Sequence, residues 1–173
     1  MFKDFSKKME GRGYKVAMVI TGGGMTAATE PTKYGGASRW FLGAELPYDR
    51  GWADRFAEMA DEFTDEDLLV PSVSARYSQL LVSALSSLVE SEVPTIYVSC
   101  SAKLTYEGER GGREHCAFIT VLHPAGITTY KAKLLLSSRD IQEQTVASFI
   151  CKLVLHHTST EKPYECDALT VVT

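Results

Sequence analysis

Residues 16–48, VAMVITGGGMTAATEPTKYGGASRWFLGAELPY, decide the fold of this chain. The apolar run from Val16 to Ile20 is typical of a buried strand, and three glycines follow it at 22–24. A short helix and the segment Gly35-Gly36-Ala37-Ser38 then lead into a second apolar run, which we expect to be a strand from Ser38 to Tyr48. This strand–turn–helix–strand order predicts the start of an α/β domain.

The glycine turn has two interpretations. Glycines directly after a strand allow backbone N–H groups to approach a phosphate or an oxyanion closely, and Ser38, at the mouth of the next strand, would face the same cleft. Triple glycines are also common in ordinary turns. Spacing alone gives the two interpretations about equal weight.

Length and composition exclude several classes of protein. A chain of 173 residues with 45% hydrophobic content fits one domain with a full core. The net charge of -4 argues against a nucleic-acid surface, and no apolar run approaches the ~20 residues that cross a bilayer. The N-terminal residues lack the apolar stretch of a signal peptide. We therefore expect neither a nucleic-acid partner nor a membrane partner.

The cysteines and histidines give no sign of a metal site or a cofactor. The four cysteines, at 100, 116, 151 and 166, form no C-x-x-C pair, and the four histidines form no spacing typical of metal ligands. Cys100, Cys116 and Cys151 are best explained as buried thiols in a reducing compartment, which predicts a cytoplasmic protein.

The remaining pattern alternates helices and strands. Apolar residues recur at helical spacing from Ser74 to Ser91, with Ser72 or Ser74 as the cap, and the stretch from Thr95 to Cys100 is typical of a central strand. We also expect three further helices: one at the N-terminus with Phe2, Phe5 and Met9 on one stripe, one over 52–59 with Trp52, Phe56 and Met59 on one face, and one over 139–157. The segment 64–67 is expected to be an acidic solvated turn and 103–113 a loop. The segments 115–122 and 127–136 are expected to form a hairpin. Together these elements predict a three-layer α/β/α sandwich around a mixed sheet, formed by residues 1–157, with a C-terminal tail at 158–173.

The order of short motifs resembles the C-terminal domain of the CinA family (competence-damage-inducible proteins), which are nicotinamide mononucleotide deamidases. The family's Thr-Gly-Gly loop, small-residue helix, Gly-Ser-Ser run, aromatic-Phe pair and tyrosine have counterparts in Thr21-Gly22-Gly23-Gly24, Ala27-Ala28-Thr29, Gly36-Ala37-Ser38, Trp40-Phe41, Gly43 and Tyr48. Ser72-Val73-Ser74 and Ser138-Arg139-Asp140 are similar to the segments that precede two later family helices. The match spans about residues 10–157 and is loose between Asp49 and Pro71.

The resemblance implies a site as well as a fold. It implies Ser38 as the nucleophile, Tyr48 and Arg139 as further catalytic residues, and Thr21, Gly22, Gly23 and Gly24 as a ligand-binding loop. The resemblance also implies a lysine that acts together with the serine. The position of this lysine falls on Ala53, and the chain has no lysine between Lys33 and Lys103. A serine hydroxyl without a base is a weak nucleophile. Lys103, from another strand end, is the one substitute that we consider.

Three hypotheses follow. The first is a divergent, non-catalytic or impaired domain that binds a pyridine nucleotide or a related anion between the glycine turn and Ser38. The second is an active nicotinamide mononucleotide amidohydrolase that uses Ser38 with a substitute base. The third is an interaction module that binds no small molecule. The resemblance implies a homo-oligomer in all three.

Overall fold

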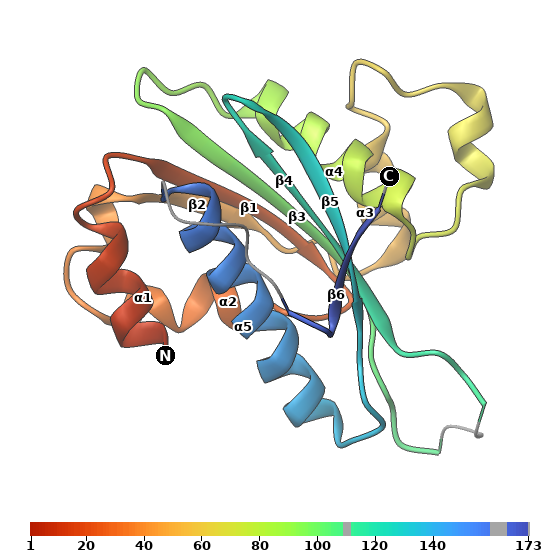
Figure 1. Ribbon diagram of the computed structural model, residues 1–173. Coiled ribbons are helices and arrows are strands. Elements are labelled where there is room, and N and C mark those ends of the chain that lie inside the picture. The colour runs from red at the N-terminus through yellow and green to blue at the C-terminus, as the bar shows by residue number, and fades with distance from the viewer. Residues whose placement is uncertain (109–111, 160–165, 173) are drawn as a thin grey trace.

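The computed structural model describes residues 1–108, 112–159 and 166–172, and its centre is a six-stranded sheet in the order β2-β1-β3-β4-β5-β6 (Figure 1). Its strands are β1 (Lys15–Thr21), β2 (Phe41–Glu45), β3 (Thr95–Lys103), β4 (Cys116–His123), β5 (Gly126–Lys133) and β6 (Leu169–Val172). The first three strands run parallel, and the other neighbours are antiparallel. The predicted mixed sheet is confirmed.

Helices cover both faces of the sheet, as the three-layer prediction requires (Figure 1). One face is covered by α1 (Phe2–Met9), α2 (Thr26–Thr29) and α5 (Arg139–His157), and the other by α3 (Arg50–Ala57) and α4 (Ala75–Leu88). Three short 3-10 turns complete the order: η1 (Pro31–Lys33), η2 (Ala37–Arg39) and η3 (Asp65–Leu69). Each helical layer buries its own apolar cluster against the sheet.

The strand directions bring two helix N-termini to one edge of the sheet. Because α4 connects two parallel strands, β2 and β3, it begins at the edge where those strands end. The Ser74 hydroxyl caps α4 by accepting from the Tyr77 N–H, and the Ser138 hydroxyl caps α5, which follows β5 at the same edge. Partial positive charge from both helices therefore accumulates where β1 and β3 end.

Three local expectations are corrected. The predicted tail contains β6, which pairs with β5, while 160–165 lie outside the described residues. Of the three residues predicted to share one face over 52–59, only Phe56 is buried, whereas Trp52 and Met59 are exposed. In the acidic segment Asp67 is buried, because its carboxylate accepts hydrogen bonds from the Arg76 guanidinium, which hold its pKa far below the usual range.

The glycine turn after β1 is a packing element. A side chain on Gly22 would overlap the carbonyl oxygen of Ala102 on β3, and one on Gly24 would overlap Val146 on α5. Both glycines have positive φ (79° and 91°), which glycine adopts readily. The Glu143 carboxylate of α5 accepts from the Gly24 N–H at 2.7 Å and from the Thr26 N–H at 3.0 Å. A side chain of the protein itself thus fills the position where an anion was expected.

Replacing Glu143 by alanine is expected to lower the free energy of unfolding by about 2–3 kcal/mol, because the buried Gly24 N–H loses a charged acceptor. Denaturant unfolding measures the change. The matched control is Gln144→Ala on the exposed side of the same helix. Equal stability of the two variants would contradict the proposed role of Glu143.

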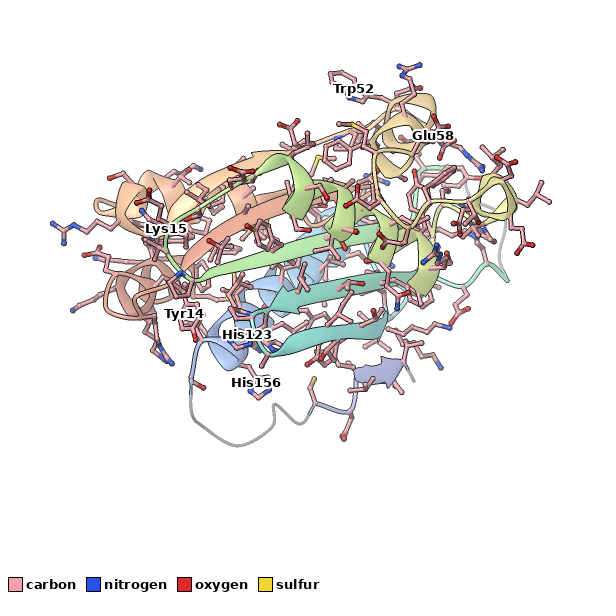
Figure 2. All side chains as sticks on the ribbon, turned by 90° about the horizontal axis from the view of Figure 1, so that it is seen from above. Tyr14, Lys15, Trp52, Glu58, His123 and His156 are labelled. Atoms are coloured by element: carbon pink, nitrogen blue, oxygen red, sulfur yellow. The ribbon has the colours of Figure 1, made fainter. Side chains whose placement is uncertain are left out.

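Histidines gather at the opposite end of the sheet, where α5 ends. The Tyr130 hydroxyl and the Nε2 atom of His157 lie 2.9 Å apart, and the rings of His156 and His123 are 5.0 and 6.1 Å from that of His157. Tyr14 contacts His123 from the segment before β1, and Figure 2 shows Tyr14, His123 and His156 at the same end of the molecule. Burial, followed by the charges of His156 and His123, lowers the pKa of His157 to about 4.

This shift predicts acid sensitivity. Well above pH 6.5 the His157 ring is neutral in both the folded and the unfolded state, so it adds no pH dependence there. As pH falls from 6.5 to about 4, the unfolded chain takes up the proton first, and stability decreases by up to about 1.4 kcal/mol per pH unit. In His157→Gln the decrease over this range is expected to be shallower, as measured by urea unfolding at several pH values. A variant with the same slope as the parent chain would refute this assignment.

Candidate functional site

A cleft of about 680 Å³ lies at the edge where β1 and β3 end. The cleft opens on the face of the sheet that α4 covers, beyond the N-terminus of that helix. Ser72 and Val73, which precede α4, line it, and the strands of the sheet extend past these two residues. Three adjacent strands contribute side chains to this face: Lys103, Phe118 and Lys131. Phe118 pairs with Lys131 on one side and with Ser101 on the other. Lys103 lies two residues after Ser101, so its side chain is on the same face of the sheet. β2 lies on one side of β1 and β3 on the other, so the strand order changes direction at β1. Ligands of α/β sheets bind at such topological switch points.

The cleft is strongly basic. Its lining includes five cationic side chains and one carboxylate: Arg50, Lys103, Arg113, Lys131, Arg139 and Glu114. This excess of positive charge is notable in a chain with a net charge of -4. Focused charge of one sign in a cleft attracts ligands of the other sign. The site is therefore suited to an anion.

Some of these charges are already paired. The Lys131 ammonium lies 2.8 Å from the Glu114 carboxylate, and this hydrogen bond lowers the pKa of Glu114 and raises the pKa of Lys131. Arg50 lies 3.5 Å from Asp54. The Lys103 side chain makes no hydrogen bond or ion pair with any residue in the described part of the chain. Its ammonium is thus the most available cation of the cleft.

Aromatic rings lie between the charges. The Arg113 guanidinium is 5.5 Å from the ring centre of Tyr106, and the Lys131 ammonium is 5.8 Å from that of Phe118. Cys116 also lines the cleft, but burial raises the pKa of its thiol, so it stays protonated and is a poor nucleophile. The cleft offers charge and flat apolar surface together.

The structure brings together Arg139, Tyr48 and the glycine turn. The Arg139 guanidinium donates to the Tyr48 hydroxyl at 3.2 Å, to the Gly22 carbonyl at 3.3 Å and to the Thr105 carbonyl at 3.1 Å. These acceptors come from the loops that follow β2, β1 and β3. They explain why a cation is tolerated in the first turn of α5, where the helix dipole disfavours it.

Ser38 lies apart from this group. It belongs to η2, before β2, and its backbone carbonyl accepts from the Lys15 ammonium at 3.1 Å. Lys15 begins β1, whereas Gly22 follows its end, so the length of the strand, about 20 Å, separates Ser38 from the cleft. The expectation that Ser38 faces the same cleft as the glycine turn is therefore wrong for a single chain. A serine that precedes a parallel strand lies at the amino edge of the sheet.

Two of the predicted ligand-binding glycines are also unsuited to that role. Gly23 and Gly24 are buried, and Glu143 occupies the Gly24 N–H. Gly22 lines the cleft, while Thr21 is the last residue of β1 and is half-buried. The packing interpretation of the turn accounts for these residues.

The position of the family lysine is a core position here. Ala53 is 2% exposed and packs between α3, α4 and the sheet. Lys103, the substitute considered from the sequence, does line the cleft with Tyr48 and Arg139. The cleft thus contains an ammonium, a phenol and a guanidinium, but not Ser38.

Sequence reasoning missed several members of the site: Arg50, Arg113, Glu114 and Lys131. The sequence did contain a signal for Lys131. This residue lies in the second strand of the predicted hairpin, and that strand ends at the same edge of the sheet as the central strand. Arg113 and Glu114 lie next to a loop whose path no periodic pattern predicts.

Within the described residues no group of His, Cys, Asp and Glu side chains is arranged to hold a metal ion. None of the helices described has the length and apolarity to span a membrane.

Comparison with known proteins identifies the fold. No protein-family model matches the sequence, and no curated protein is similar to it in sequence. A CinA superfamily protein from Klebsiella pneumoniae 700603 superposes with a TM-score of 0.74 at 11% identity, covering 91% of this chain and 94% of that one. The competence or damage-inducible protein from Enterobacter asburiae gives a TM-score of 0.74 at 12% identity, covering 92% of this chain and 99% of that one. The competence/damage inducible protein CihA from Agrobacterium tumefaciens gives a TM-score of 0.72 at 12% identity, covering 91% of this chain and 96% of that one.

These similarities extend over nearly the whole of each chain, although the identities are low. They agree with the α/β architecture described above. This chain has the fold of the CinA superfamily, as a divergent sequence on that fold.

Proposed function

We propose that this protein binds a phosphorylated small molecule, with a pyridine nucleotide as the first candidate, and that it does not hydrolyse it. The observation that carries the proposal is the concentration of five cationic side chains around one cleft at the carboxyl edge of β1 and β3. Phosphate groups are the common small-molecule partners of such sites.

The surrounding structure supports an anion at this place. The N-termini of α4 and α5 lie at the same edge of the sheet, and each contributes partial positive charge. Tyr48, Tyr106 and Phe118 add flat surface that a planar ring can stack on. A phosphate attached to an aromatic base satisfies both features of the cleft.

Catalysis is not part of the proposal, because the groups for it are not assembled. Ser38 lies at the other edge of the sheet, and its carbonyl, rather than its hydroxyl, accepts from Lys15. The guanidinium groups of Arg139 and Arg50 offer only N–H donors and no acceptor, so they cannot act as bases. Without a positioned base, the 10²–10⁴-fold gain that general-base assistance typically gives is lost.

The binding proposal predicts a specific loss. Nicotinamide mononucleotide is expected to raise the melting temperature of the parent chain, and Lys103→Ala is expected to weaken binding about tenfold, because a charge-assisted hydrogen bond is removed. Titration calorimetry gives the dissociation constants. The matched control is Lys3→Ala, which removes an exposed lysine of α1. Equal binding by the two variants, or no binding by the parent chain, would count against the proposal.

The non-catalytic part is tested by ammonia release. The parent chain is expected to release no more ammonia from nicotinamide mononucleotide than a buffer blank, and Ser38→Ala is expected to bind it as the parent does. A coupled ammonia assay with long incubation provides the measurement. Release that disappears in Ser38→Ala would establish the alternative hypothesis of an active amidohydrolase.

A further inference from the structure

We infer that the Glu114 carboxylate is an internal competitor at the anion site, and that a ligand phosphate must displace it from the lysines of the cleft in order to bind. Among the described residues that line the cleft, Glu114 is the one with a carboxylate. A negative charge opposes the binding of an anion, so its place in a basic cleft calls for an explanation. The inference rests on the proposed function, because it concerns how the same cleft admits its ligand.

Three lysines surround this carboxylate. Lys131 and Lys133 lie two residues apart on β5, so their side chains project from the same face of the sheet. Lys103 shares that face, because Lys103 and Lys133 are both cross-strand partners of Cys116. The hydrogen bond from Lys131 is the main reason that the pKa of Glu114 is lowered, and the charges of the other two lysines lower it further. The carboxylate thus lies where cations from two strands converge.

The pair that Glu114 forms is open to exchange. The side chains of Glu114 and Lys131 are 57% and 37% exposed, and exposed ion pairs contribute little to stability because water and salt screen them. In the described part of the chain Lys131 is the one hydrogen-bond partner of the Glu114 side chain. By contrast, Asp54, the partner of Arg50, also accepts a hydrogen bond from the Tyr77 hydroxyl at 2.8 Å. Glu114 is therefore the less firmly held of these two carboxylates.

A phosphate suits these lysines better than a carboxylate does. A phosphate monoester carries about 1.5 to 2 negative charges near pH 7 and offers three acceptor oxygens, whereas a carboxylate carries a single charge. Three ammonium groups on one face of the sheet repel one another, and a single carboxylate offsets only part of that repulsion. A phosphate dianion offsets more of it. The exchange therefore favours the ligand, although the resident ion pair has to break.

The displaced carboxylate has a second partner nearby. Lys133 lies about 7 Å beyond Lys131 along the strand, and it lines a neighbouring cavity of about 460 Å³. Glu114 lines both this cavity and the cleft, so it lies on the boundary between them. Turning from Lys131 to Lys133 frees Lys131 for the ligand and keeps the carboxylate paired. Rotation of one side chain is thus enough to admit an anion.

Charge removal tests the competition. Glu114→Gln keeps the size of the side chain and removes its charge, and inorganic phosphate is the probe, titrated by calorimetry in low salt at about pH 8, where it is a dianion. The variant is expected to bind phosphate about three- to tenfold more tightly than the parent chain, because no ion pair has to break. The matched control is Glu107→Gln, which removes an exposed carboxylate that lines neither cavity. It should bind phosphate as the parent chain does.

A double-mutant cycle separates displacement from simple repulsion between like charges. Lys131→Met removes the lysine that the carboxylate and the ligand share, so in this background Glu114→Gln is expected to raise the phosphate affinity less than about twofold. Absence of measurable binding by both Lys131→Met chains would also support the inference, since the shared lysine would then be essential to the ligand. Equal phosphate affinity of the parent and Glu114→Gln chains, no binding by Glu114→Gln, or a gain that persists undiminished with Lys131→Met would each overturn it.

The competition and the proposed function fail separately. Tighter phosphate binding by Glu114→Gln, together with no binding of nicotinamide mononucleotide by the parent chain, would reject that nucleotide as the ligand and support the competition. Nucleotide binding by the parent chain, together with equal phosphate affinities of the parent and Glu114→Gln chains, would retain the proposed function and overturn the competition.

Discussion

The tight contact between the turn after β1 and its neighbours fixes most of this structure. Gly22 lies so close to Ala102 on β3 that no side chain fits between them, and Glu143 ties the same turn to α5. β1, β3 and α5 therefore meet at one point. Because Arg139 is one turn from Glu143 on α5, its guanidinium reaches the loops after β1, β2 and β3. The basic cleft is built on this junction.

The fold could be predicted from sequence because its main elements have strong periodic signals. The helix at Ala75–Leu88 has a clear apolar stripe and a serine cap, and Arg139–His157 was predicted with its observed bounds. The weaker elements were misjudged where partners distant in sequence decide the outcome. Leu169–Val172 is too short to identify as a strand without β5 beside it, and Asp67 is buried only because Arg76 pairs with it.

The site was less predictable, for a related reason. Tyr48 and Arg139 were identified and do meet, but Ser38 was assigned to the wrong edge of the sheet because its distance in sequence from the glycine turn says nothing about strand direction. The glycine turn itself looks the same in sequence whether a ligand or a glutamate fills it. Glu143 lies 119 residues from Gly24, so local patterns carry no sign of the pairing. Charges that converge from separate loops are equally invisible until the loops are placed.

The burial of Ala53 limits the side chains that this position accepts. The side chain is enclosed by Phe56 and the apolar faces of α4 and the sheet. A lysine placed here would bring an ammonium group into a dry interior and would destabilise the domain. An amine can therefore take part in the chemistry of this cleft only from a residue that lines it, as Lys103 does.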